Sequence, residues 1–89
     1  MVLGVAMVKV MPGKERSVYY AIKCKGEVLD IYHIFGEFDF FIILQAEELG
    51  KLNMLIEEIQ EINGVTEART ILISRVNSLQ EYGPIKVLA

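Results

Sequence analysis

The sequence predicts a small α+β domain with the element order β-α-β-β-α-β. Two observations predict this order. Four short apolar runs have the length and composition of strands, at residues 2–11, 28–35, 38–45 and 65–76. Two further segments carry apolar residues at helical spacing, at residues 14–25 and 49–62. The helical segments follow the first and third runs, and a chain of 89 residues is long enough for one domain only.

Turn-forming residues bound the first strand and the first helix. The run 2–11 is rich in β-branched residues and is followed by Pro12 and Gly13, which favour a turn. The helix expected over 14–25 has a basic last turn and is followed by Gly26, as is common where helices end. Its buried face is formed by Val18, Ala21 and Ile22.

The middle of the chain predicts a hairpin followed by the clearest helix. Only Gly36 and Glu37 separate the second and third strands, so we expect a tight hairpin there. The helix over 49–62 ends at Asn63 and Gly64, a typical stop signal. Its apolar face is formed by Leu49, Leu52, Leu55, Ile56, Ile59 and Ile62.

The complete order is the ferredoxin-like pattern, in which a four-stranded antiparallel sheet carries two helices on one face. No linker, low-complexity tract or long internal repeat divides the sequence. We therefore expect a single domain over residues 1–89, with residues 77–89 forming a C-terminal tail.

Both faces of the expected sheet are apolar near their middles. The third strand has two apolar sides, formed by Phe38, Phe40, Ile42 and Leu44 and by Phe41 and Ile43. The second strand is expected to place Val28 on the same side as Asp30 and Tyr32. Two helices cover one face, and a second face in contact with water would be polar. We therefore expect a homodimer in which two sheets pack face to face about a two-fold axis, a dimeric α/β barrel-type assembly.

The composition argues against several classes of protein. Apolar residues make up 53% of the chain, more than one small core needs, which supports an interface. The net charge of −3 lacks the basic footprint of a nucleic-acid-binding protein, so we expect no direct DNA binding. No apolar run reaches the ~18 residues that span a membrane. The single cysteine, Cys24, cannot form an internal disulfide and fits a cytoplasmic location.

The sequence contains no recognisable catalytic or metal-binding motif. His33 is the only histidine and has no Cys, Asp or Glu partners at metal-ligand spacing. No nucleophile with an adjacent base and no phosphate-binding loop is visible, so we expect neither an enzyme nor a cofactor. The alternative is a small cofactor-free monooxygenase or isomerase that uses His33, Tyr32 and Asp30.

Three segments resemble a known family. They are the hairpin Gly36-Glu37-Phe38-Asp39 with the apolar residues after it, the turn Ile62-Asn63-Gly64-Val65, and Pro12-Gly13-Lys14 after the first strand. Together they resemble the effector domain of Lrp/AsnC transcription regulators, also called the RAM domain, over roughly residues 3–76.

The resemblance implies a regulatory function. Such domains form dimers through their sheets, assemble into octamer-like rings, and bind small effectors, usually amino acids, between neighbouring dimers. The family usually carries a helix-turn-helix DNA-binding domain before this one. This chain begins at the first strand, so we expect a stand-alone domain that could act on full-length Lrp/AsnC regulators. A ligand-free assembly partner of such regulators is a second alternative.

The residues that this resemblance assigns to the effector site are Phe35, Gly36, Glu37, Phe38, Asp39, Ala68 and Thr70, the last two from another chain. Asp39 could accept a hydrogen bond from an effector ammonium group, and N–H groups near Gly36 could meet a carboxylate. Phe35 and Phe38 could form the walls of an apolar pocket. The family often has Thr-x-Thr at the last two positions, so only one hydroxyl is kept here. Alternatively, Gly36 supplies only a positive φ angle and Asp39 bonds only to turn amides.

Charged residues on the fourth strand allow two interpretations. Glu67 and Arg69 share one face of this strand, and Arg75 is expected to join them. We expect these residues to form ion pairs. The alternative is that Arg69 binds the carboxylate of a ligand.

Overall fold

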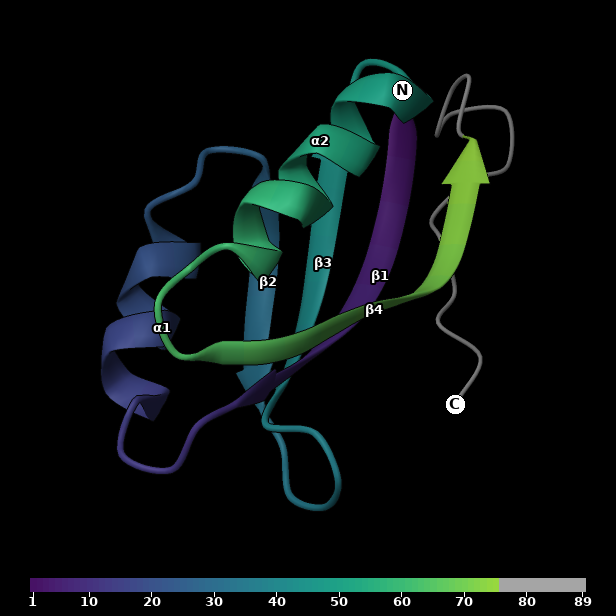
Figure 1. The fold of residues 1–89 in the computed structure, drawn as a ribbon. Coiled ribbons are helices and arrows are strands. Elements are labelled where there is room, and N and C mark those ends of the chain that lie inside the picture. The colour runs from purple at the N-terminus through teal and green to yellow at the C-terminus, as the bar shows by residue number, and fades with distance from the viewer. Residues whose placement is uncertain (76–89) are drawn as a thin grey trace.

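The computed structural model describes residues 1–75 and contains the six predicted elements in the predicted order. They are β1 (Val2–Val10), α1 (Glu15–Lys23), β2 (Val28–His33), β3 (Phe40–Ala46), α2 (Leu49–Gln60) and β4 (Val65–Arg75), as Figure 1 shows. The tail expected at residues 77–89 lies outside the described residues, as does the predicted last residue of the fourth strand, Val76.

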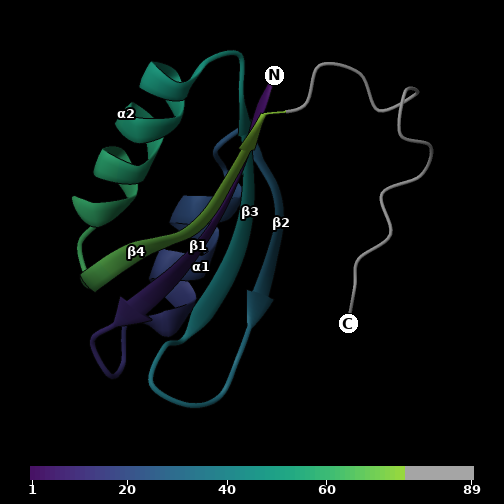
Figure 2. The same cartoon turned by 90° about the vertical axis from the view of Figure 1, so that its right-hand side faces the viewer.

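The four strands form one antiparallel sheet with the order β2-β3-β1-β4. The two central strands are therefore β3 and β1, and the two edges are β2 and β4. Both helices lie on the same side of this sheet, and no helix of residues 1–75 lies on the other side (Figure 2). The ferredoxin-like fold predicted from the sequence is confirmed.

The core lies between the sheet and the two helices, where the apolar side chains on one face of the strands pack against the apolar stripe of each helix. The sheet contributes Val2, Ala6, Val8, Val10, Phe40, Ile42, Leu44 and Ala68. The helices contribute Val18, Ile22, Leu52, Leu55, Ile56 and Ile59. Leu49 was predicted to join the helical stripe but is exposed, because it is the first residue of α2 and extends past the sheet contact.

The opposite face of the sheet, here called the open face, is apolar in its middle. Its apolar residues are Leu3, Val5, Met7, Tyr32, Phe41, Ile43 and Leu72. The same pairings place polar residues around them, namely Lys9, Asp30, Gln45, Glu67, Arg69 and Ser74. Tyr32 and Leu72 keep 49% and 59% of their surface exposed, while the residues of the central strands are half-buried by their neighbours. At the β2 edge, the Tyr32 hydroxyl donates a hydrogen bond to the Asp30 carboxylate at 2.6 Å, which raises the pKa of Tyr32.

Irregular pairing in the edge strands moves two residues to the face opposite to the predicted one. In β2, Val28 pairs with Leu44 of the core face, and a register shift separates it from Asp30. The prediction that Val28 shares a side with Asp30 and Tyr32 is therefore wrong. In β4, a shift next to Ile71 pairs Arg75 with buried Val2, so Arg75 does not join Glu67 and Arg69. One extra residue in a strand reverses the alternation of all residues beyond it.

The connection between β2 and β3 is longer than the predicted tight hairpin. It spans residues 34–39, here called the hairpin loop, and the Ile34 N–H donates to the Asp39 carbonyl at 2.8 Å. The Asp39 N–H donates to the Val8 carbonyl at 2.8 Å. The Ile34–Asp39 bond therefore closes the loop, and residues 35–38 lie beyond the paired part of the two strands.

Gly64 determines how closely the turn before β4 packs against α1. Its carbonyl accepts a hydrogen bond from the Met11 N–H at 2.8 Å, and its φ angle is +104°. A Cβ atom at this position would lie 2.7 Å from Lys14 Cβ and 3.1 Å from Val18 Cγ2. Both the backbone conformation and the space therefore require glycine.

We predict that Gly64→Ala lowers the free energy of unfolding by about 1–3 kcal/mol, because the alanine is strained and crowds α1. Urea denaturation measures this change. The matched control is Gly26→Ala, where φ is not positive and no atom lies within 4 Å of the added Cβ. Equal losses in both variants would contradict this explanation.

Candidate functional site

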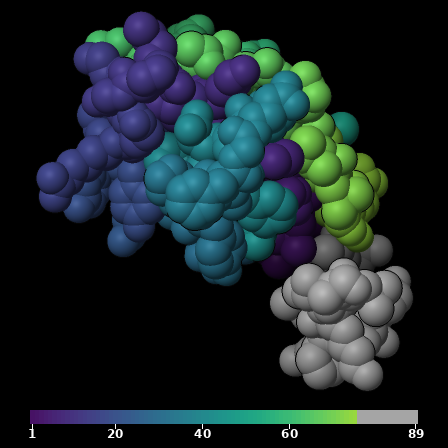
Figure 3. Space-filling model, turned by 90° about the horizontal axis from the view of Figure 1, so that it is seen from below, coloured from purple at the N-terminus to yellow at the C-terminus, as the bar shows by residue number. Residues whose placement is uncertain are grey.

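The hairpin loop projects from the end of the sheet where β2 ends and β3 begins (Figure 1). In the view from below, its blue-green atoms face the viewer (Figure 3). Five of the seven residues assigned to the effector site lie in this loop. They are Phe35, Gly36, Glu37, Phe38 and Asp39.

Asp39 fixes the base of the hairpin loop to the central strand β1. In addition to its backbone bond to Val8, its Oδ2 atom accepts a hydrogen bond from the Val10 N–H at 2.7 Å. The side chain is partly buried, and its second oxygen, Oδ1, accepts no hydrogen bond from the part of the chain described. Asp39 Oδ2 therefore bonds to an amide of β1 and not to turn amides, and Oδ1 is left as a possible acceptor for another group.

The tip of the hairpin loop is presented to solvent. Phe35 keeps 96% of its surface exposed, and Glu37 is exposed as well. Gly36 has a φ angle of +127°, a conformation that other residues rarely adopt. The His33 ring lies 5.8 Å from the Phe35 ring and 5.2 Å from the Phe40 ring, which connects the tip to the core.

Phe38 is buried separately from the core, beneath a charged side chain of β4. The Arg69 guanidinium carbon lies 5.3 Å from the centre of the Phe38 ring, and an Arg69 nitrogen lies 2.8 Å from the Glu67 carboxylate. The expected Glu67–Arg69 ion pair is therefore present, and a cation–π contact accompanies it. Phe38 and Phe35 do not form the walls of a common pocket within one chain, because one is buried and the other is exposed.

Ala68 and Thr70 lie on β4, on the face that the helices cover. Ala68 is buried opposite Val8, and its carbonyl accepts a hydrogen bond from Gln60 Nε2 at 3.1 Å. Thr70 pairs with Ala6 and is exposed. Within one chain, the closest link between the hairpin loop and β4 is thus the Phe38–Arg69 contact, not a contact through Ala68 or Thr70.

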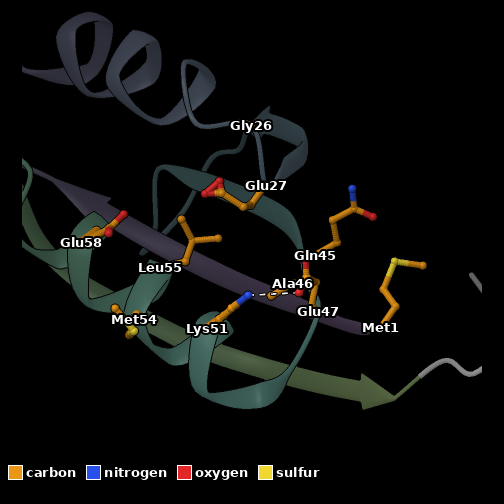
Figure 4. Close-up of a pocket in the computed structure, with 10 residues that line it drawn as sticks. All are labelled: Met1, Gly26, Glu27, Gln45, Ala46, Glu47, Lys51, Met54, Leu55 and Glu58. Carbon is orange, nitrogen blue, oxygen red and sulfur yellow. Dashed lines mark hydrogen bonds and ion pairs between the residues drawn. The ribbon is translucent and has the colours of Figure 1, made fainter.

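A second candidate site lies at the opposite end of the sheet, where β3 ends and α2 begins (Figure 4). It is an open groove of about 570 Å³, here called the helix groove. Its lining residues are Met1, Gly26, Glu27, Gln45, Ala46, Glu47, Lys51, Met54, Leu55 and Glu58. The turn between α1 and β2 forms one wall and α2 forms the other. The turn is held in place by the Gln45 N–H, which donates to the Glu27 carbonyl at 2.9 Å.

The helix groove holds more acidic than basic groups. Lys51 Nζ lies 3.0 Å from the Glu47 carboxylate, which raises the pKa of Lys51 and keeps this amine charged. Lys25 Nζ lies 3.1 Å from the Glu58 carboxylate, across the gap between the turn and α2. Glu27 forms no ion pair within residues 1–75.

Sequence reasoning did not find the helix groove. The Glu47–Lys51 pair at helical spacing was visible, but solvent-exposed helices commonly carry such pairs. The approach of the Gly26–Glu27 turn to α2 has no local sequence signal. Within residues 1–75, no cluster of three His, Cys, Asp or Glu side chains is placed to hold a metal ion. In the same range, no helix has the length and apolar character needed to cross a membrane.

Comparisons with known proteins agree on one family. The model of the Lrp/AsnC ligand binding domain matches residues 4–79. The HTH-type transcriptional regulator FL11 of Pyrococcus furiosus is 22% identical over 85 residues, which are 96% of this chain and 56% of FL11. The chain thus spans little more than half the length of this curated relative.

Solved structures show the same fold. The crystal structure of FFRP-DM1 has a TM-score of 0.79 and 26% identity, and the match covers 84% of this chain and 100% of that one. Transcriptional regulator NMB0573 of Neisseria meningitidis, solved as a complex with L-Met, has a TM-score of 0.71 and 15% identity. That match covers 85% of this chain and 51% of the Neisseria chain.

The hydrogen bond from Val10 to Asp39 generates a stability prediction. Asp39→Ala leaves the Val10 N–H without its acceptor and should lower the free energy of unfolding by about 1–2 kcal/mol. Asp39→Asn keeps an acceptor oxygen and should lose less. Urea denaturation of both variants measures the difference, with Glu37→Ala in the exposed tip as the control. A loss in Asp39→Asn as large as in Asp39→Ala would show that the charge, not the acceptor, stabilises the loop.

Proposed function

The chain belongs to the family of Lrp/AsnC ligand-binding domains, which are parts of transcriptional regulators, and on this premise we propose that it is a regulatory module that binds an amino-acid effector. The observation that carries this proposal is the family match over residues 4–79, nearly the whole chain. The complex of the Neisseria regulator with L-Met, a neighbour in fold, supports an amino acid as the class of effector.

The open face supports a homodimer built by packing two sheets together. Its central residues Val5, Met7, Phe41 and Ile43 are apolar and lie on the two middle strands. Covering such a surface stabilises a complex by roughly 25 cal/mol per Å² of apolar area removed from water. Two copies related by a two-fold axis bring the same apolar surface against itself, so each covers the other.

The hairpin loop supports an effector site between neighbouring dimers. An amino acid needs an acceptor for its ammonium group and a donor for its carboxylate. Asp39 Oδ1 is free to accept, while the Arg69 guanidinium, which lies over the adjacent Phe38, can donate in a charge-assisted pair. This assigns Arg69 the ligand-binding role that sequence reasoning left as the alternative to an ion pair.

The remaining assigned residues complete the site from two chains. The exposed tip residues Phe35, Gly36 and Glu37 extend from one chain toward a neighbour. The neighbour supplies its β4 region, where the exposed Thr70 hydroxyl can donate or accept and Ala68 contributes only a small side chain. Dimers joined through such sites form an octamer-like ring. A chain of this kind can also join full-length Lrp/AsnC regulators and change their assembly.

The arrangement of His33, Tyr32 and Asp30 counts against the alternative of a small enzyme. Asp30 and Tyr32 lie on the open face, whereas His33 pairs with Phe40, and the centres of their rings lie 5.2 Å apart. The three side chains therefore do not converge on one cavity. The helix groove contains none of them.

We expect Val5→Asp to convert the dimer to a monomer, because the added carboxylate would be buried without a partner at the centre of the sheet contact. Asn53→Asp adds the same charge on an exposed position of α2 and should leave the assembly intact. Light scattering at micromolar protein concentration measures both. A wild-type chain that is monomeric under these conditions would refute the proposed dimer.

Amino-acid binding is tested by a thermal-shift screen against the standard amino acids, since a ligand that binds only the folded state raises Tm. At least one amino acid should raise Tm, and Asp39→Asn should abolish the shift without loss of the fold. Glu27→Gln, at the other end of the sheet, is the control and should retain the shift. If no amino acid raises Tm, the chain acts as a ligand-free assembly partner instead.

A further inference from the structure

The chain leaves the sheet beside the helix groove. Arg75, the last described residue, pairs with Val2 of β1, and Val2 pairs on its other side with Ala46, which lines the groove. Because neighbouring strands lie about 4.8 Å apart, the end of β4 is only about 10 Å from Ala46. Figure 4 shows the end of β4 close to Met1, which also lines the groove. The residues that follow Arg75 therefore start next to this groove.

The apolar part of the helix groove is incompletely covered by residues 1–75. Met54 and Met1 keep 60% and 49% of their surface exposed, whereas Ala46 is half-buried and Leu55 is buried. The groove volume of about 570 Å³ leaves room for several apolar side chains. The lysines at its rim already form ion pairs with glutamates. An apolar occupant therefore gains most from this groove, because it removes the exposed methionines from water.

One segment after Arg75 has the composition of such an occupant. Residues 85–88 have the sequence Ile-Lys-Val-Leu, with three apolar side chains in four residues. In residues 76–84, by contrast, apolar residues stand singly between polar ones. These nine residues connect the apolar segment to Arg75 and span at most about 30 Å, which is well above the distance to Ala46. The segment can therefore reach the groove of its own chain.

We propose that the helix groove is the docking site of residues 85–88 of the same chain. Ile85, Val87 and Leu88 cover the apolar lining, and Lys86 remains at the rim in contact with water. Docking removes apolar surface of both the segment and the groove from water, which supplies the stabilisation. The covalent connection raises the local concentration of the segment above that of any free molecule, so this occupant is favoured.

Disulfide formation locates the segment. The full chain carries Cys24→Ser, which removes the only native thiol, together with Val87→Cys and Gly26→Cys. Gly26 lines the groove and has open space for a side chain without a positive φ angle. The control replaces Gly26→Cys by Gly50→Cys, which is equally unhindered but lies outside the groove, in the first turn of α2.

Under mild oxidation of dilute protein, the cysteines at 26 and 87 should form a disulfide within one chain. The reaction should be at least about tenfold faster than in the control, because docking places the segment beside residue 26 and not merely near this end of the sheet. Intact mass and non-reducing gels measure both rates. Equal rates in the two pairs would overturn the proposal, as would a disulfide that joins two chains.

The methionine methyl groups give an independent readout of the occupied groove. Val87→Asp would bury a carboxylate against apolar side chains, so it should release the segment and shift the methyl NMR signal of Met54. Met7 on the open face should not move, which also shows that the sheet is intact. Leu79→Asp makes the same change in the connecting residues and should leave Met54 in place. An unshifted Met54 in Val87→Asp would refute the docking site, and a shift of Met7 instead would place the segment on the open face.

Discussion

The structure depends on one constraint: two helices cover only one face of a sheet whose central strands are apolar on both. The central strands alternate between two sets of apolar side chains, and only one set reaches the core under α1 and α2. The other set, around Val5 and Ile43, is left at the surface. Because apolar area exposed to water is unfavourable, the proposed dimer follows from the strand pattern itself, and the proposed effector site between dimers follows from the dimer.

The order of elements could be predicted from the sequence because local patterns determine it. The apolar stripe of α2 and the alternation of β1 and β3 each occur within a single segment. The errors arose where pairing with a distant segment decides the structure. The side on which Val28 and Arg75 lie depends on register shifts against β3 and β1. At the base of the hairpin loop, Asp39 bonds to Val8 and Val10 of β1, which are distant in sequence.

The candidate sites also differ in whether local or distant residues form them. The residues of the hairpin loop are consecutive, so a sequence motif could point to them. The neighbour that covers Phe38, by contrast, is Arg69 of β4, which is distant in sequence. The helix groove is assembled from a turn, the end of a strand and a helix, and its lining residues come together only when these three segments do. No spacing within the sequence encodes that arrangement.

The two irregularities of β4 also affect how the domain meets other molecules. An edge strand offers a row of free backbone N–H and C=O groups, to which the edge of another sheet can add. In β4 the extra residues Thr66 and Ile71 break the regular spacing of these groups. Edge-to-edge growth into fibrils is thereby disfavoured on this side, which leaves the face of the sheet for the proposed dimer, a contact that two-fold symmetry closes.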